Sequence, residues 1–376
     1  MKHYYIFVFS LIMFFASLSF CIPVAYASYH FGTFTGRPPI HVLGSATASP
    51  SGLSPDALKS AYHLPKTGGS GTIAVVGAYI DPTIASDLVV FNKQFGLADC
   101  TIKNGCLTVH PMSTTLGTNS GWSMETSLDV EWSHAIAPQA KILLVEAKTA
   151  SGANLLSALD YAVAQSGVVA VSMSWGGAEF PEEVGLDSHF IVGKNKNITF
   201  FASAGDNGSG ASWPASSPYV VGVGGTRLSI SETGSVISET AWNGSGGGVS
   251  AYETEPNYQT TYNIPRAGGM RAIPDVSYDA DPVSGVSVYY SGKVGVTKGW
   301  YVVGGTSAGA PQWAGIKALG LSADNQKFYA DKLSSSPLQF FRDVRSGING
   351  DCGYVCTART HYDYVTGLGS PMTVKF

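Results

Sequence analysis

Residues 140–177 read AKILLVEAKTASGANLLSALDYAVAQSGVVAVSMSWGG, and this stretch decides the fold class. AKILLVEA and VVAVSMSWGG are largely apolar runs, and ANLLSALDYAVAQSG between them has the apolar spacing of an amphipathic helix. Strands that are apolar throughout are buried on both faces, as in parallel sheets whose strands are joined by helices. The stretch therefore predicts a strand–helix–strand unit of a parallel sheet.

The same alternation extends to both sides of this unit. Apolar runs at 71–80 (GTIAVVGAYI) and 198–206 (ITFFASAGD) predict further strands, and residues 124–137 (METSLDVEWSHAIA) predict a helix. Such an alternation gives an α/β fold, a mostly parallel β-sheet flanked by helices on both faces, with ligands at the carboxyl ends of the strands. The irregular, glycine- and serine-rich residues 227–281 predict long surface loops instead of a separate domain.

The N-terminus has the pattern of a secretory signal. A basic start precedes a long apolar run and the small-residue pattern Ala25-Tyr26-Ala27, which predicts a signal peptide over residues 1–27. The length of the apolar run leaves an uncleaved membrane anchor as the alternative. Residues 28–52 then form a short N-terminal lead and residues 53–376 a single domain. We therefore expect a secreted, extracellular protein.

The composition is sparsely charged. Charged residues make up 13% of the 376 residues, and the formal net charge at pH 7 is −4. Protonation of every carboxyl group leaves at most 22 Lys and Arg side chains and 8 His side chains to repel one another, which is few for this length. The composition therefore suits an acidic medium, and no basic patch indicates nucleic acid.

The cysteines indicate an oxidising compartment. Cys21 lies in the signal, and four cysteines remain, an even number. We predict two local disulfides, Cys100 with Cys106 and Cys352 with Cys356, and the alternative is a four-cysteine zinc site, for which the spacings are poor.

A second stretch, GGTSAGAP at 304–311, points to chemistry. It lies between an apolar run, TKGWYVV, and a stretch of helical character, QWAGIKALGLSA. A glycine turn between a strand and a helix exposes a side chain beside free backbone N–H groups, so Ser307 is a candidate nucleophile, with an ordinary helix cap as the alternative. A serine nucleophile needs a base. No histidine outside the signal lies in a glycine-rich H-G-T turn, and we expect ordinary surface or core roles for His30, His41, His63, His110, His134, His189 and His361.

Three carboxylic acids are candidates instead. Glu125 and Asp129 lie four residues apart on the predicted helix and so project from the same face, where two like charges repel. They form either a solvated acidic face or a pair that shares a proton and supplies a general base. Asp206 follows a predicted strand, where it forms either a simple turn with Asn207-Gly208 or, when protonated, a donor to an oxyanion.

Several segments in order resemble the sedolisin family of serine-carboxyl peptidases, including kumamolisin-like enzymes. They are ETSLDVEW, AIAPQAKILLVEA, SMSWGG, ASAGDNG, PDVSYDADP, GGTSAGAP and YDYVTGLGSP. The resemblance covers about residues 53–376 and implies a subtilisin-like fold. It also implies that Ser307 is the nucleophile, Glu125 its general base, Asp129 the carboxylate that orients Glu125, and Asp206 the oxyanion donor beside the Ser307 N–H.

The resemblance also implies one structural calcium site near the C-terminus, because FRDVRSG and ARTHYDYVTG match the layout of the family's site. The ligands would be the side chains of Asp343 and Asp363 and the carbonyl oxygens of Val344, Arg359 and His361. Two carboxylates with several carbonyl oxygens suit a hard cation such as Ca²⁺.

The sequence thus predicts a secreted, acid-acting serine-carboxyl endopeptidase that cleaves protein or peptide substrates through an acyl-enzyme. We expect a monomer with no nucleic-acid partner and no membrane contact beyond the signal. One alternative is an inactive exported binding protein of the same fold. The other is an α/β-hydrolase-type esterase, because GTSAG fits the G-x-S-x-G pattern and Asp343 or Asp351 with His361 would complete its triad.

Overall fold

The computed structural model describes Met1 and residues 31–372, apart from 233, 293–296, 322 and 334–339. Except for Met1, the predicted signal peptide lies outside the described residues, as does His30. Within the described part of the chain, no helix is both long and apolar enough to cross a membrane.

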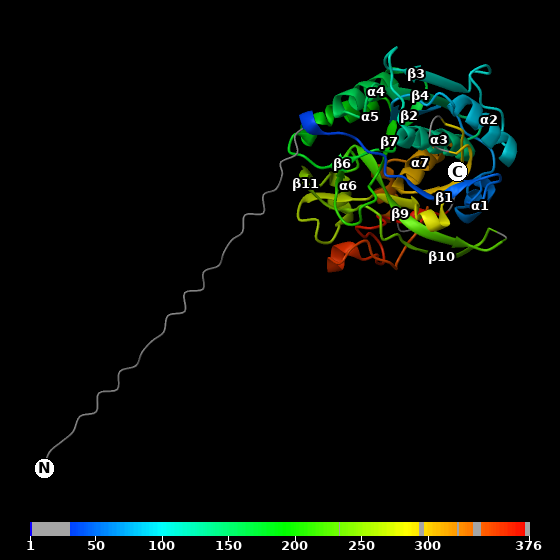
Figure 1. The fold of residues 1–376 in the computed structure, drawn as a ribbon. Helices are drawn as coiled ribbons and strands as arrows, with labels where there is room; N and C mark the ends of the chain where they lie inside the picture. The colour runs from blue at the N-terminus through cyan, green and yellow to red at the C-terminus, as the bar shows by residue number, and fades with distance from the viewer. Residues whose placement is uncertain (2–30, 233, 293–296, 322, 334–339, 373–376) are drawn as a thin grey trace.

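An eight-stranded sheet forms the centre of the molecule (Figure 1). Its strands run in the order β10-β9-β7-β5-β2-β4-β3, with β13 also paired to β9, and every pairing except β10 with β9 is parallel. The prediction of a mostly parallel sheet is therefore confirmed. The strands are β2 Thr72–Ala78, β3 Leu107–Pro111, β4 Lys141–Ala147, β5 Val168–Met173, β7 Thr199–Ser203, β9 Val220–Ile230, β10 Val236–Ala241 and β13 Val276–Asp279.

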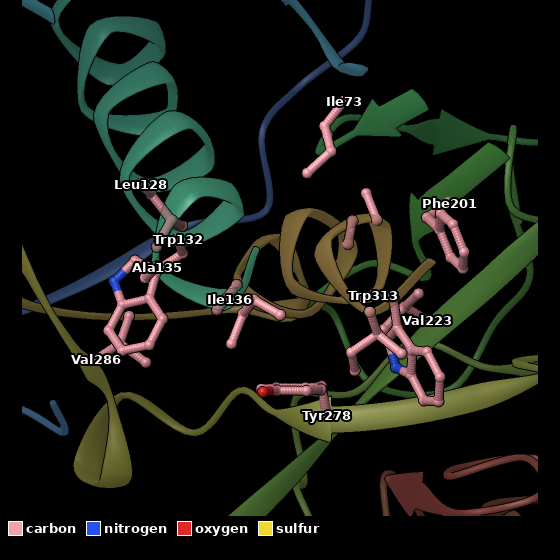
Figure 2. Close-up of a cluster of buried hydrophobic side chains, with 14 of the residues drawn as sticks. Ile73, Leu128, Trp132, Ala135, Ile136, Phe201, Val223, Tyr278, Val286 and Trp313 are labelled. Carbon is pink, nitrogen blue, oxygen red and sulfur yellow. The ribbon is translucent and has the colours of Figure 1, made fainter. Parts of the chain in front are cut away.

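Helices cover both faces of this sheet because its strands are apolar on both faces. In β2, Ile73 and Val75 pack into one core with helices α3 and α7, while Ala74 and Val76 pack into a second core with α4. Figure 2 shows the first core, where Leu128 and Ile136 of α3 and Trp313 of α7 lie together. The helices are α1 Pro55–Ala61, α2 Ile84–Phe95, α3 Ser120–Ile136, α4 Gly152–Ala164, α5 Ser188–Asn195, α6 Asn257–Tyr262, α7 Gly309–Ala318 and α8 Asn325–Leu333.

A separate three-stranded antiparallel sheet lies beside the first core. Its order is β1 (His41–Thr47), β15 (Gly299–Gly304) and β14 (Val286–Tyr290). The TKGWYVV run is thus a strand, as predicted, but outside the main sheet. Part of the predicted N-terminal lead forms β1, which pairs His41 with Gly304 directly before the Ser307 turn.

The prediction of surface loops for residues 227–281 is wrong. This segment contains β10, β11, α6, β12 and β13, and two of these strands belong to the main sheet. These strands are short and mix apolar with polar residues, so local periodicity gives little sign of them. The remaining short strands are β6 Gly177–Ala178, β8 Ser212–Trp213, β11 Gly248–Thr254, β12 Met270–Ile273, β16 Phe341–Arg342 and β17 Ser370–Pro371.

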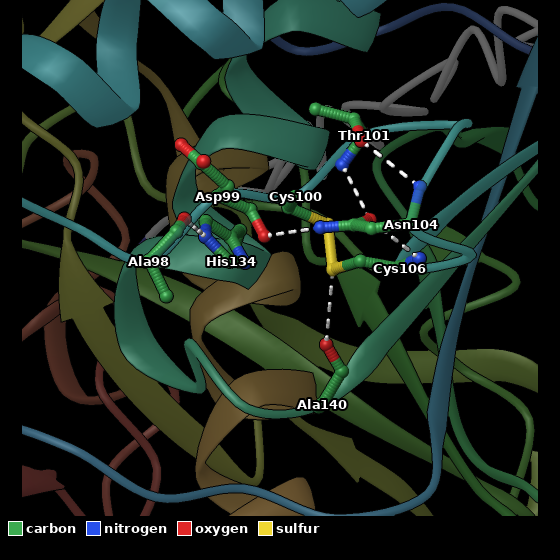
Figure 3. Close-up of a disulfide and its surroundings, with 8 residues drawn as sticks. All are labelled: Ala98, Asp99, Cys100, Thr101, Asn104, Cys106, His134 and Ala140. Atoms are coloured by element: carbon green, nitrogen blue, oxygen red, sulfur yellow. Dashed lines mark hydrogen bonds between the residues drawn. A yellow bond between two sulfur atoms is a disulfide. The ribbon is translucent and has the colours of Figure 1, made fainter.

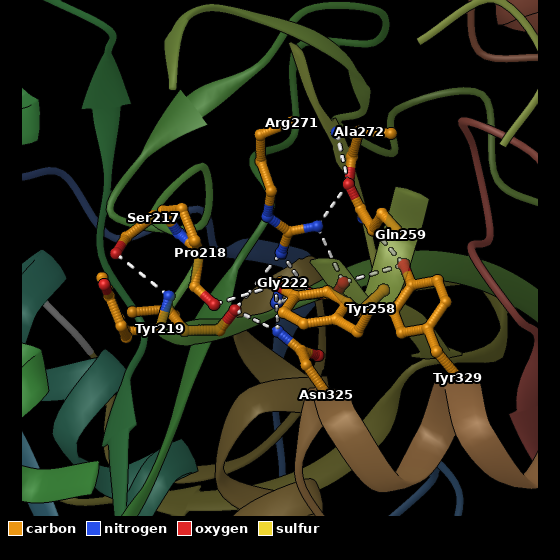
Figure 4. Close-up of polar contacts among 12 residues, drawn as sticks. Ser217, Pro218, Tyr219, Gly222, Tyr258, Gln259, Arg271, Ala272, Asn325 and Tyr329 are labelled. Carbon is orange, nitrogen blue, oxygen red and sulfur yellow. Dashed lines mark hydrogen bonds and ion pairs between the residues drawn. The ribbon is translucent and has the colours of Figure 1, made fainter. Parts of the chain in front are cut away.

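A buried ion pair fixes the chain between β12 and β13 (Figure 4). Arg271 is fully buried, and its Nη2 lies 2.5 Å from Oδ2 of Asp275. The same oxygen accepts a hydrogen bond from the N–H of Gly222 in β9 at 2.8 Å, and Tyr329 donates to Oδ1. A surface hollow of about 690 Å³ lined by Tyr258 and Tyr329 adjoins this network, but none of the predicted site residues line it.

Both predicted disulfides are present. Cys100 pairs with Cys106, and Cys352 pairs with Cys356. Their sulfurs are therefore not free to bind zinc, and the zinc alternative is wrong. His134 lies near the first disulfide, but its Nε2 contacts the carbonyl oxygen of Ala98 at 2.9 Å (Figure 3).

Candidate active site

The candidate residues come together where α3 and α7 pack over the carboxyl ends of β5 and β7. Ser307 lies in the 3-10 turn Thr306–Ala308, which joins β15 to α7. Glu125 and Asp129 lie on α3, whose first turn is capped by the side chain of Asn119. Asp206 follows β7. A helix contact thus brings two carboxyl groups to a serine that is far away in sequence.

The two carboxyl groups of α3 are buried beside Ser307. Glu125 and Asp129 are each 2% exposed, and Ser307 is fully buried. Ser307 lies close enough to the Glu125 carboxyl group to offset part of the rise in pKa that burial causes. Within the described residues, however, neither Glu125 oxygen nor Ser307 Oγ has a partner at hydrogen-bond geometry. The approach therefore lacks the alignment of a formed hydrogen bond, as is common in active sites without substrate.

Burial favours the neutral forms of this pair. It raises the pKa of Glu125 well above its usual value, and the nearby Asp129 raises it further. Burial also raises the pKa of Asp129 to about 8, against the lowering effects of its hydrogen bond with Ser174 and of the nearby Glu125 side chain. The two groups therefore titrate as a unit that keeps protons in acid.

Thr306 holds Asp206 in one orientation. Oδ1 of Asp206 accepts hydrogen bonds from the N–H and the hydroxyl of Thr306, both at 2.8 Å, and the Thr306 hydroxyl in turn accepts from the N–H of Gly205. Because Oδ1 already accepts two hydrogen bonds, the proton of the neutral acid belongs on Oδ2. Burial raises the pKa of Asp206, and the contact with His41 lowers it.

The expectation of an ordinary surface or core role is wrong for His41. Its Nε2 lies 3.1 Å from Oδ2 of Asp206, so it is not an ordinary surface histidine. It contacts Asp206, while Ser307 Oγ has no hydrogen-bond partner in the described part of the chain. No local pattern announces this contact, because the two residues are far apart in sequence and meet only through the pairing of β1 with β15.

The N-terminal segment before β1 forms part of the wall of a cleft at this site, and Figure 1 shows this segment in blue crossing the molecule towards β1. Arg37 and Gly176 exchange two backbone hydrogen bonds, at 3.0 and 3.2 Å, and the Phe34 ring packs edge-on against Trp213. The cleft, of about 610 Å³, is lined by residues 33–35 and 37–41 and by 176–178, 203–212 and Gly246. The N-terminal segment is thus one of the walls of this cleft.

Gly305 allows this close approach. Its φ of 111° favours glycine, and a Cβ there would collide with the carbonyl oxygen of Pro39 and with Oδ2 of Asp206. The Pro39 carbonyl group and the buried Oδ2 of Asp206 therefore both lie against Gly305.

The predicted calcium residues lie in two loops that contact each other. Oδ2 of Asp343 accepts from Arg345 Nε at 2.9 Å and from the N–H of His361 at 3.1 Å. Oδ1 of Asp343 is buried and has no partner among the described residues. The carbonyl oxygens of Val344, Arg359 and His361 likewise accept no hydrogen bond in the described structure. Four oxygen atoms are thus free for a hard cation.

Asp363 fits a cation less readily. Its Oδ1 accepts from the N–H groups of Val365 and Thr366, and its Oδ2 accepts from the N–H of Arg359 and the hydroxyl of Thr366. To act as a ligand it would have to release one of these donors. His361 donates to Asp343 through its backbone N–H. An esterase triad would need a hydrogen bond from the His361 ring, and the bond that joins these two residues is a different one.

Two further site residues were not singled out from the sequence. Thr306 orients Asp206, and Ser174, directly after β5, donates a hydrogen bond to Oδ1 of Asp129 at 2.5 Å. Ser174 lies at the carboxyl end of a buried strand, a position that could have drawn attention to it. Thr306 is adjacent to the nucleophile candidate.

Comparisons with known proteins agree with this architecture. The sequence profile of the subtilase family matches residues 113–339, so the chain belongs to the subtilase family, whose members are serine-type peptidases. Kumamolisin from Bacillus sp. (strain MN-32) is 30% identical over 370 residues, which cover 88% of this chain and 64% of kumamolisin. Sedolisin from Pseudomonas sp. (strain 101) is 29% identical over 321 residues, which cover 73% of this chain and 53% of sedolisin.

A solved structure points the same way. It is Pseudomonas sedolisin, a serine-carboxyl proteinase complexed with two molecules of pseudo-iodotyrostatin. It superimposes with a TM-score of 0.71 at 27% identity, covering 87% of this chain and 96% of that chain. The resemblance to the sedolisin family and the subtilisin-like α/β fold are confirmed, and the esterase alternative is wrong. The chain spans 64% and 53% of the two curated relatives.

Proposed function

We propose that the chain is a secreted, acid-acting serine-carboxyl endopeptidase. Ser307 attacks the peptide carbonyl group, Glu125 accepts the hydroxyl proton, and Asp129 orients Glu125 and shares its proton. The observation that carries this proposal is the buried pair Glu125 and Asp129 beside a buried serine. Glu125 passes the serine proton to the leaving amine as the peptide bond breaks. A water molecule then attacks the acyl-enzyme and gives a proton to Glu125, which returns it to Ser307 Oγ as the acid product leaves.

Asp206 is the proposed oxyanion donor, together with the N–H of Ser307. Only the neutral acid has a proton to donate, and Thr306 leaves that proton on Oδ2. Because a carboxyl group is neutral below its pKa, activity requires acid and falls as the pH rises through the pKa of Asp206. The Glu125 pair acts while it holds one proton, because Glu125 must be ionised to accept from Ser307 while Asp129 keeps a proton. Loss of that remaining proton at higher pH lowers activity with the same sign.

The cleft supports an endopeptidase over removal of short peptides from a free N-terminus. The backbone of Gly176, which lines the cleft, pairs with Arg37 in the middle of an extended stretch of the chain. A backbone edge that pairs with the middle of one chain can pair with the middle of a protein substrate. The expected substrates are therefore unfolded proteins or long peptides, and we propose that the enzyme acts as a monomer.

We further propose one structural Ca²⁺ at the C-terminal loops. Asp343 and the carbonyl groups of Val344, Arg359 and His361 offer free oxygen atoms, and Asp363 would complete the set. Bound Ca²⁺ would join the two loops and has no part in the reaction steps. Export is proposed from the N-terminal signal pattern and the two disulfides.

The test is a pH profile of casein or haemoglobin cleavage. Wild type should be most active in acid, and Ser307→Ala and Glu125→Gln should each lose at least about a hundredfold in kcat. Glu131→Gln is the matched control, because Glu131 is an equally buried carboxyl on the same helix but accepts from the N–H of Tyr289. An optimum near neutral pH, or an active Glu125→Gln variant, would contradict the mechanism.

A further inference from the structure

Ser174 connects the carboxyl pair to the backbone of the nucleophile. Its side chain is buried, and its Oγ lies 2.5 Å from Oδ1 of Asp129 and 3.2 Å from the carbonyl oxygen of Ser307. In a helix the carbonyl group of Ser307 would accept from the N–H four residues later, but that residue is Pro311, which has none. The Ser174 hydroxyl therefore stands where the missing donor would be.

A hydroxyl has one hydrogen, and Ser174 faces two acceptors. The carbonyl oxygen of Ser307 can only accept, and an ionised Asp129 can only accept as well. When Asp129 is ionised, the Ser174 hydrogen goes to Asp129 because the charged acceptor binds it more strongly. When Asp129 is neutral with its proton on Oδ1, Asp129 donates to Ser174 Oγ, and the Ser174 hydrogen is free for Ser307.

We propose that Ser174 is a positioning residue that anchors the backbone of Ser307 only while Asp129 is protonated. The proposal rests on the proposed function, since it assigns a role to the Asp129 proton in that mechanism. The relay runs from Asp129 through Ser174 to the Ser307 carbonyl group, and no covalent bond changes. It fixes the peptide that carries the nucleophile and the adjacent N–H in acid and releases it at higher pH.

The groups that face this relay are few. Glu125 lies on the same helix as Asp129, and Asp206 acts on Glu125 from the end of β7. Within the described part of the chain, the side chains that act on the pKa of Asp129 are those of Ser174 and Glu125. A pH effect on the relay therefore originates in the proton held by the Glu125 and Asp129 pair.

The kinetic test compares Ser174→Ala with wild type from pH 3 to the highest pH at which cleavage is measurable. In acid, loss of the donor to a buried carbonyl group should lower kcat roughly tenfold with little change in KM. The ratio of wild-type to variant kcat should then fall towards one as the pH rises, because the relay is off in wild type too. A ratio that stays constant across pH, or that is near one in acid, would overturn the proposal.

Ser172→Ala is the matched control. Ser172 lies two residues earlier on β5, is also fully buried, and its hydroxyl has no partner in the described structure. Its kcat should follow wild type at every pH. Ser174→Cys, which keeps a weak donor of similar size, should recover part of the lost rate in acid.

A structural readout separates this proposal from the proposed function. The distance to measure is that from Ser174 Oγ to the carbonyl oxygen of residue 307, in crystal structures of the inactive Ser307→Ala chain at pH 4 and pH 9. This distance should be within hydrogen-bond range at pH 4 and beyond about 3.5 Å at pH 9. This arm needs no activity, so it stands even if wild type cleaves nothing. An unchanged distance would overturn the relay.

Discussion

The protein should become less stable as the pH rises from acidic to mildly alkaline values. Replacement of Glu146 by glutamine should make this pH-dependent loss of stability much smaller. Glu146 lies on β4 and is 1% exposed; one oxygen accepts from the N–H of Asp81, and the other has no partner in the described structure. Burial, with a smaller contribution from the charge of Asp81, raises its pKa from 4.5 to about 7.

The sign and size follow from this pKa. The folded protein keeps the Glu146 proton up to about pH 7, whereas the unfolded chain loses it near pH 4.5. The stabilisation is therefore fully present below pH 4.5 and is lost as the pH rises through 7. At about 1.4 kcal/mol per pKa unit, the loss is about 3 kcal/mol. For a domain of this size that corresponds to roughly 4 °C in melting temperature.

The assay is urea unfolding followed by tryptophan fluorescence at pH 4 and pH 8. All chains carry Ser307→Ala to prevent self-digestion, and Glu232→Gln, at an exposed glutamate, is the control. The difference in unfolding free energy between the two pH values should be smaller by about 3 kcal/mol in Glu146→Gln than in the background or the control. Equal differences in all three chains would refute the reasoning that this buried carboxyl is neutral in the folded state.

Three other outcomes are expected. Asp206→Ala should lower kcat about a hundredfold. Asp206→Asn should keep more activity and extend it to higher pH, because its amide can donate to the oxyanion while Thr306 holds its oxygen. Equal losses for the two variants in a pH-rate profile would contradict the donor role. A chelator should lower the melting temperature of wild type by several degrees but not that of Asp343→Asn, and an unaffected wild type would exclude the calcium site. Replacement of Cys100 and Cys106 by serine should cost about 2 kcal/mol in unfolding free energy, as expected for a small closed loop, and calorimetry showing no loss would contradict this.

The central sheet could be predicted because its strands carry their own signal. β2, β4, β5 and β7 are apolar runs between helical patterns, and each was expected from the sequence. The strands within residues 227–281 carry a weaker signal, because they are short and mix apolar with polar residues. β13, for example, spans only Val276–Asp279, and its place in the main sheet depends on pairing with the distant β9.

The candidate site divides in the same way. Ser307, Glu125, Asp129 and Asp206 were found through motifs, and the structure brings them to one place. Ser174 and His41 gain their meaning only from contacts across the fold. The position of Ser174 after a buried strand places it near the site, but its contact with Ser307 arises because Pro311 of α7 leaves that carbonyl group without a backbone donor. Which acid His41 meets depends on strand pairing, which no local pattern shows.

Residues 33–41 supply one wall of the cleft beside Asp206, and this wall is held in place by contacts far along the chain. The Arg37 backbone is bonded to Gly176, and His41 contacts Oδ2 of Asp206. Loosening of this segment would therefore change both the shape of the cleft and one of the contacts that lower the pKa of Asp206.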